Sequence, residues 1–157
     1  MALTDRAPQG LLRLLLRAPV WVYRARLGWL FGHRLVYLAH RGRRSGRRRE
    51  TVLEVVRYDK AVPEVYVVAG WGARADWYRN LRTHPALEVR IGAGTFREPY
   101  QRFLEPDETV QLLLAYRDAH PRAWRRLAPL MGLPADPRQD EAAVRRTPAV
   151  AFRPADR

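Results

Sequence analysis

The spacing of apolar positions changes along the chain and separates an expected helical start from an expected β-rich remainder. Residues 9–18 combine leucines with two arginines four positions apart, as on one amphipathic helix. Residues 20–31 are apolar on nearly every side, which favours a second short helix. We therefore expect a helical segment over 1–33, packed on the rest of the protein or on a membrane surface, and a main domain over 34–157.

Six short segments of the main domain have the composition of strands. Glycine, proline or aspartate separates most of them, as in hairpins. Short successive strands favour an antiparallel, mainly β fold with flanking helices (α+β), closed as a small barrel or split barrel because closure removes exposed edges. The segments are 35–39, 51–58, 65–69, 87–91, 95–104 and 149–152, and the third is apolar enough to be central.

Three later segments have the spacing of helices. Asp76 and Asp107 are the expected N-caps of the first two, and Pro85 ends the first. The arginine-rich third helix begins at a proline. The three helices are expected to start at residues 76, 107 and 121.

The charge is strongly positive and comes almost wholly from arginine. The formal net charge is +13, and Lys60 is the only lysine. A field of this sign favours anionic partners such as nucleic acid, acidic lipid or a polyanionic cofactor. A high content of Arg, Ala and Pro is equally typical of GC-rich codon usage, so both explanations stay open.

Several kinds of chemistry are excluded by residue type and spacing. Cysteine is absent, which excludes disulfides and thiolate sites and is compatible with a reducing cytoplasm, where we expect the protein. We expect no metal site, because the four histidines have no ligand spacing. They are His33, His40, His84 and His120.

An arginine-rich segment between two expected strands carries the clearest signal. Residues 42–49 hold five arginines and the chain's only serine, and glycines occupy positions 42 and 46. Glycine permits tight turns, and guanidinium groups match the oxygens of phosphates and carboxylates. We interpret Ser45 as an anion ligand rather than a nucleophile, because it lacks a G-x-S-x-G context. The segment predicts an anion-binding loop.

Two further features follow in the sequence. Gly70-Trp71-Gly72 places an aromatic residue between glycines at a strand end, and a helix with Trp77, Tyr78 and Asn80 comes directly after it. Together with the arginine loop, they would suit a flat aromatic ligand with a long anionic tail.

The order of these motifs resembles the deazaflavin-dependent nitroreductase family over about residues 35–103. The resemblance implies a split β-barrel of the FMN-binding type and the deazaflavin coenzyme F420, with FMN less favoured. It also implies hydride transfer to a quinone, a nitro compound or a similar small-molecule electron acceptor. The motifs are Gly42-Arg43-Arg44-Ser45-Gly46, Arg49-x-Thr51, Asp76-Trp77-Tyr78-Arg79-Asn80-Leu81 and His84-Pro85.

The resemblance also assigns residues to the coenzyme. The arginine loop is expected near the tail, while the following strand and the glycine-flanked turn lie near the ring, supported by the Trp77–Asn80 helix. Tyr78 and Tyr116 are candidate proton donors. The expected coenzyme-binding residues are Arg43, Arg44, Ser45, Gly46, Arg49, Thr51, Val52, Gly70, Trp71, Gly72, Trp77 and Asn80.

Two other functions compete with the reductase. The leucine- and tryptophan-rich start of the chain suits a non-enzymatic protein that binds lipid or another hydrophobic ligand on the same barrel. For the reductase itself, the same segment suits a peripheral location on the inner face of the plasma membrane. Nucleic-acid binding is a third hypothesis, but it is not expected, because the aromatic residues do not alternate with the arginines. Barrels of this type often pair, so a homodimer is a further expectation.

Overall fold

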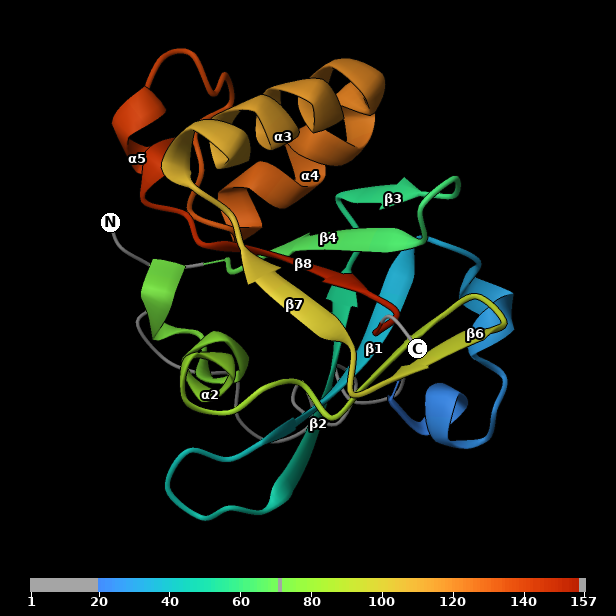
Figure 1. The fold of residues 1–157 in the computed structure, drawn as a ribbon. Coiled ribbons are helices and arrows are strands. Elements are labelled where there is room, and N and C mark those ends of the chain that lie inside the picture. The colour runs from blue at the N-terminus through green and yellow to red at the C-terminus, as the bar shows by residue number, and fades with distance from the viewer. Residues whose placement is uncertain (1–19, 71, 156–157) are drawn as a thin grey trace.

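The computed structural model describes residues 20–70 and 72–155. In these residues, eight strands form two four-stranded antiparallel sheets (Figure 1). The strands are β1 Leu35–Arg41, β2 Arg48–Glu54, β3 Arg57–Asp59, β4 Glu64–Val68, β5 Glu88–Ile91, β6 Gly94–Arg97, β7 Tyr100–Phe103 and β8 Ala149–Arg153. The first sheet has the order β2-β1-β5-β6 and the second the order β3-β4-β8-β7. The antiparallel split barrel with flanking helices is confirmed, and β4, expected to be central, lies inside its sheet.

Two expected strands are each divided, and both breaks occur where the chain crosses between the sheets. After β2, the backbone N–H of Val55 donates to the carbonyl of Arg34, next to β1 of the first sheet. The backbone N–H of Val56 donates instead to the carbonyl of Tyr66, in β4 of the second sheet. Between β6 and β7, Glu98 has a positive φ of 45°, and the proline after it has no N–H to donate. Uninterrupted strands over 51–58 and 95–104 were therefore wrong, because each segment serves both sheets.

The main core lies between the inner faces of the two sheets. Alternate residues of β1 and β5 meet alternate residues of β4 and β8, as the period of two in a strand requires. Leu81 of α2 (Asp76–Thr83) belongs to the same core. The inner strand residues are Val36, Leu38, Val65, Val67, Val89, Ile91, Val150 and Phe152.

Helices cover the outer face of the second sheet. The helices are α3 (Pro106–Ala119), α4 (Pro121–Leu130) and the short α5 (Glu141–Arg145), which the sequence pattern did not predict. They enclose a second core around Leu113 and Trp124. The N-cap of α3 is Glu105 rather than Asp107, since Glu105 and Glu108 form a reciprocal capping box.

The outer face of the first sheet is covered by the start of the described chain. Residues 20–24 are helical, Arg26 takes a positive φ of 60°, and a 3-10 turn, η1, follows over Gly28–Phe31. The single helix expected over 20–31 is therefore interrupted. Val20 and Tyr23 pack on β1 in a third core, and the helix expected over 9–18 lies outside the described residues.

Two buried tyrosines should make the fold sensitive to alkaline pH. Burial raises the pKa of Tyr23 to about 12, and burial with the Glu54 carboxylate raises the pKa of Tyr116 to about 12. The unfolded chain releases these protons near pH 10. We therefore expect the free energy of unfolding to fall between pH 10 and 12 by roughly 2 kcal/mol per tyrosine, measured by denaturant titration.

The matched control is the double variant Tyr23→Phe with Tyr116→Phe, which removes both protons. Its stability should fall less over the same interval. An identical loss in the variant and the wild-type protein would contradict this origin of the pH dependence.

Candidate functional site

Residues 42–47 of the arginine-rich segment form a six-residue loop between β1 and β2, while Arg48 and Arg49 begin β2. The two glycines of the loop are needed for different reasons. Gly46 has a φ of +68°, which favours glycine. A Cβ on Gly42 would lie 2.7 Å from the Ser45 hydroxyl oxygen. That oxygen accepts a bond of 3.2 Å from the Arg47 amide, so Ser45, predicted as an anion ligand, also braces the loop from within.

The loop is attached to helix α2 through Arg43. Its backbone N–H and its guanidinium NH1 each donate to Oδ1 of Asn80, both at 3.0 Å. The same guanidinium lies 3.1 Å from Oδ1 of Asp76. Asp76 was expected to cap α2, but the N-cap is Ala75, and the Asp76 carboxylate pairs with the loop instead. Two donors of Arg43, the backbone N–H and NH1, are therefore used within the protein.

The other side of the Asn80 amide meets His40, at the end of β1. Nδ2 of Asn80 lies 3.0 Å from Nδ1 of His40, and each residue is only 4% exposed. Burial, helped by the nearby Arg49 charge and opposed by Asp76, lowers the pKa of His40 to about 4. His40 is thus a neutral imidazole near pH 7, and its Nδ1 can accept the amide proton.

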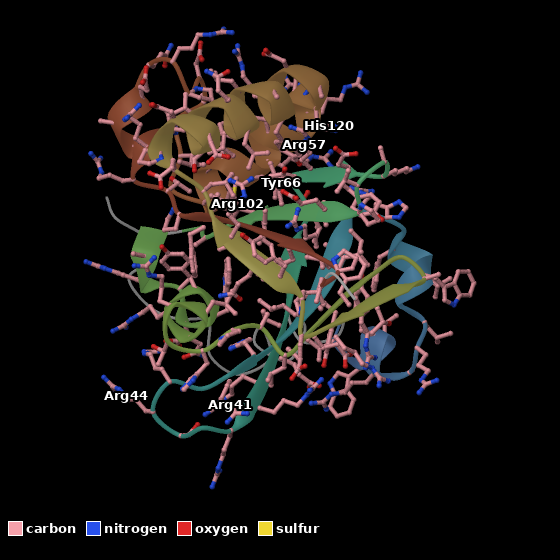
Figure 2. All side chains as sticks on the ribbon, in the orientation of Figure 1. Arg41, Arg44, Arg57, Tyr66, Arg102 and His120 are labelled. Atoms are coloured by element: carbon pink, nitrogen blue, oxygen red, sulfur yellow. The ribbon has the colours of Figure 1, made fainter. Side chains whose placement is uncertain are left out.

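Four arginines around this attachment keep exposed, uncompensated guanidinium groups. Within the described residues, their side chains make no hydrogen bond or ion pair. By contrast, Arg24 and Arg48 pair with Glu50 on the outer face of the first sheet. Figure 2 shows two of the four, Arg41 and Arg44, at the β1–β2 end of the molecule, far from the labelled His120. The four are Arg41, Arg44, Arg47 and Arg49.

The pairing of β1 with β2 divides the predicted coenzyme residues of β2 between the two faces of the sheet. Arg49 pairs with His40, and Thr51 pairs with Leu38, so both lie on the side of the main core and α2. Val52 pairs with Tyr37 and packs in the third core instead. The structure therefore places Arg49 and Thr51 on one face of the sheet and Val52 on the other.

The glycine-flanked turn connects β4 to α2. Gly70 lies against Met131: a Cβ added to Gly70 would lie 3.3 Å from the Met131 side chain. Gly72 has a φ of +71° and begins the 3-10 turn η2 (Gly72–Arg74), and α2 begins two residues later, at Asp76. Trp71 lies outside the described residues. The turn is thus joined through a few residues to the point where α2 meets the arginine loop.

The aromatic residues predicted to act at the site lie in different cores. Trp77 and Tyr78 of α2 are half-buried beside the main core, and their rings meet edge-on at 6.1 Å. Tyr116 is buried among the helices in the second core, where its hydroxyl donates to Oε1 of Glu54 at 3.2 Å. Of the two candidate proton donors, only Tyr78 lies on α2, the helix to which the arginine loop is attached.

His40 is the residue of this site that the sequence reasoning missed. It was grouped with the other histidines as a residue without ligand spacing. The signal available was its position: alternation along β1 puts His40 on the same face as Val36 and Leu38, directly before the arginine loop. A buried imidazole at that point needs a partner, and Asn80 supplies it.

The fold and the site define a split-barrel protein with a basic, glycine-bounded loop held against a helix. A family model described as F420H(2)-dependent quinone reductase matches residues 15–123. The chain therefore belongs to the F420H2-dependent quinone reductase family, and it is a reductase that depends on the deazaflavin coenzyme F420.

Solved structures support the fold at low sequence identity. A structure described as an F420-H2 dependent reductase (FDR-A) matches with a TM-score of 0.51 and 20% identity, covering 77% of this chain and 95% of that chain. A second, described as a domain-swapped dimer, matches with a TM-score of 0.51 and 18% identity, covering 86% and 99%.

A third structure is a protein of unknown function, Atu2129 from Agrobacterium tumefaciens. It matches with a TM-score of 0.50 and 18% identity, covering 99% of this chain and 60% of that chain. No curated protein sequence matches the chain significantly.

The side-chain amide of Asn80, which contacts both Arg43 and His40, gives the first test of the site. Asn80→Ala leaves the Arg43 amide and His40 Nδ1 without their partner in a buried position. We expect the free energy of unfolding in urea to fall by about 1–3 kcal/mol. Thr83→Ala, in the last turn of the same helix, removes a hydroxyl with one long contact of 3.4 Å and should cost far less. Equal losses would contradict the importance of the amide.

Proposed function

We propose that this protein transfers a hydride from reduced F420 to a quinone, with nitro compounds as a second class of acceptor. Membership of the F420H2-dependent quinone reductase family supports the coenzyme and the quinone. The single structural observation that carries the placement of the coenzyme is the group of exposed guanidiniums around a braced loop.

The loop and the start of β2 fit the coenzyme's polyanionic tail. Arg44 and Arg49 have no protein partner among the described residues, so they can bind phosphate or carboxylate oxygens without first breaking an ion pair. Asp76 is the acidic group that pairs with the loop, and Arg43 neutralises it. We expect Arg44 and Arg49 to hold the tail, with Arg43 fixing the loop behind them.

The bound coenzyme supplies the hydride, and the protein supplies position and an electrostatic field. We propose that the turn at Gly70–Gly72 lies along the ring, since it leads directly into the helix that holds the loop. Exposed guanidiniums near the site would favour the negative charge that develops on the acceptor.

Tyr78 is the better candidate to donate a proton to the reduced acceptor. It is half-buried on α2, the helix that contacts the loop. Tyr116 has a pKa raised to about 12 and a hydroxyl committed to Glu54, which makes it a weak acid in a different core. A solvent proton can serve the same purpose, so catalysis need not depend on Tyr78 alone.

Charge reversal on the loop tests the proposed site. In Arg44→Glu with Arg49→Glu, the affinity for oxidised F420 should fall at least tenfold, measured by the change in coenzyme fluorescence, because each replaced guanidinium forms charge-assisted bonds. Oxidation of reduced F420 by a quinone and by a nitro compound should slow in parallel.

The matched control changes the same charge elsewhere. Arg122→Glu with Arg125→Glu reverses two exposed arginines on α4 and should bind the coenzyme as the wild-type protein does. Similar weakening in both double variants would mean that net charge, rather than the loop, determines binding. Unchanged binding in the loop variant would show that the tail is held at another place.

We also propose that the segment over 1–33 brings the protein to an anionic membrane surface. No described helix is long and apolar enough to cross a membrane. Within this segment, Trp21, Trp29 and Leu30 are 59%, 57% and 61% exposed, next to the basic Arg24 and Arg26. Aromatic and leucine side chains flanked by arginine suit the boundary between headgroups and acyl chains.

Vesicle co-sedimentation tests the membrane proposal. Replacing Trp21, Trp29 and Leu30 with serine should greatly reduce binding to vesicles that contain phosphatidylglycerol, because the apolar anchor is lost. The control is Leu130→Ser, which removes an equally exposed leucine (67%) from α4 and should leave binding unchanged. Binding that persists in the triple variant would contradict the proposal.

Light scattering on the same samples distinguishes a second use of this surface. One structural neighbour is described as a domain-swapped dimer, so we propose a homodimer as the alternative role of the exposed tryptophans. A dimer that dissociates in the triple variant, without any vesicle binding by the wild-type protein, would favour that alternative.

A further inference from the structure

We propose that His40 is a positioning residue for coenzyme binding, acting through the Asn80 amide on Arg43 and the arginine loop. The proposal rests on the proposed function, because it assumes that the loop holds the coenzyme. It concerns a residue that touches neither the loop backbone nor any exposed guanidinium through a hydrogen bond.

The orientation of the Asn80 amide follows from its partners. Arg43 presents two donors, its backbone N–H and guanidinium NH1, and both lie 3.0 Å from the same amide atom. Only the oxygen of the amide can accept from them, so Nδ2 must face the opposite way, toward His40. The contact with His40 Nδ1 at 3.0 Å is then a donation from Asn80.

His40 secures this orientation because its Nδ1 carries a lone pair. An apolar residue at position 40 would leave the Nδ2 protons without a partner in a site that is almost fully buried. The amide could then turn to find another partner, and its oxygen would leave Arg43. The imidazole thus removes the alternative arrangement.

Holding the Arg43 guanidinium on Asn80 and Asp76 has a consequence for the anion site. The loop is fixed at Arg43, its second residue after β1, which orients the exposed Arg44 that follows. A loop that is ordered before binding loses less conformational entropy when the anion arrives. His40 therefore contributes to affinity without contacting the ligand.

Two amide substitutions separate this role from a merely structural one. Asn at position 40 can place an oxygen close to the position of Nδ1, whereas Gln is longer and cannot reach the same point. In His40→Leu and His40→Gln, we expect the Kd for oxidised F420 to rise about tenfold. In His40→Asn, we expect a Kd within about twofold of the wild-type value. Thermal unfolding of each variant controls for folding.

A spectroscopic measurement tests the contact without the coenzyme. Asn80 is the only asparagine in the chain, so selective ¹⁵N labelling of asparagine gives a single side-chain amide signal. Its protons should exchange slowly with solvent in the wild-type protein and faster in His40→Gln and His40→Leu, both of which keep Asn80 as the only asparagine. The ¹⁵N shift of His40 Nδ1 should be that of an unprotonated nitrogen at pH 7.

The outcomes are distinguishable. If the wild-type protein binds F420 and the two variants His40→Asn and His40→Gln have the same affinity as each other, the positioning role is wrong, while the proposed function stands. A protonated Nδ1, or fast exchange of the Asn80 amide in the wild-type protein, would overturn the contact itself. A wild-type protein that does not bind F420, despite the expected amide signals, would overturn the proposed function and, with it, the role in binding.

Discussion

The structure depends on one shared amide group. Asn80 joins the end of β1 to the arginine loop and joins both to α2, using one side of its side chain for Arg43 and the other for His40. Because the three groups are buried or partly buried, each bond replaces one that water would otherwise make. Without this group, the loop would be an ordinary hairpin turn with a high positive charge.

This attachment divides the arginines of the loop region into two kinds. Arg43 is held by Asn80 and Asp76, while Arg44 and Arg49 remain exposed and without a partner in the described part of the chain. The outer face of the same sheet shows the contrast, because there Glu50 accepts from Arg24 and Tyr37. Although burial alone would raise the pKa of Glu50, these bonds lower it. On that face Arg24 and Arg48 are paired with a carboxylate, whereas Arg44 and Arg49 have no such pair among the described residues.

Much of the fold could be predicted from the sequence, because apolar alternation and turn residues report local backbone preference. The breaks at Val55 and Glu98 could not be predicted, since at each point the chain leaves the first sheet and joins the second, which only the assembled fold determines. The arginine loop could be recognised from the sequence as a motif, but the sequence did not show that Arg43 would bond to α2 while Arg44 stays exposed. His40 and Asn80 are forty residues apart, and only the assembled barrel brings them together.

In the proposed complex, Arg44 of the braced loop and Arg49 at the start of β2 bind the anionic tail of F420, while Arg43 stays on Asn80. A crystal structure of the complex with oxidised F420 tests it most directly. We expect tail oxygens to lie within hydrogen-bonding distance of Arg44 or Arg49, with the contact between Arg43 and Asn80 retained. A tail bound at another surface, or a loop in which Arg43 leaves Asn80 to bind the coenzyme, would contradict it.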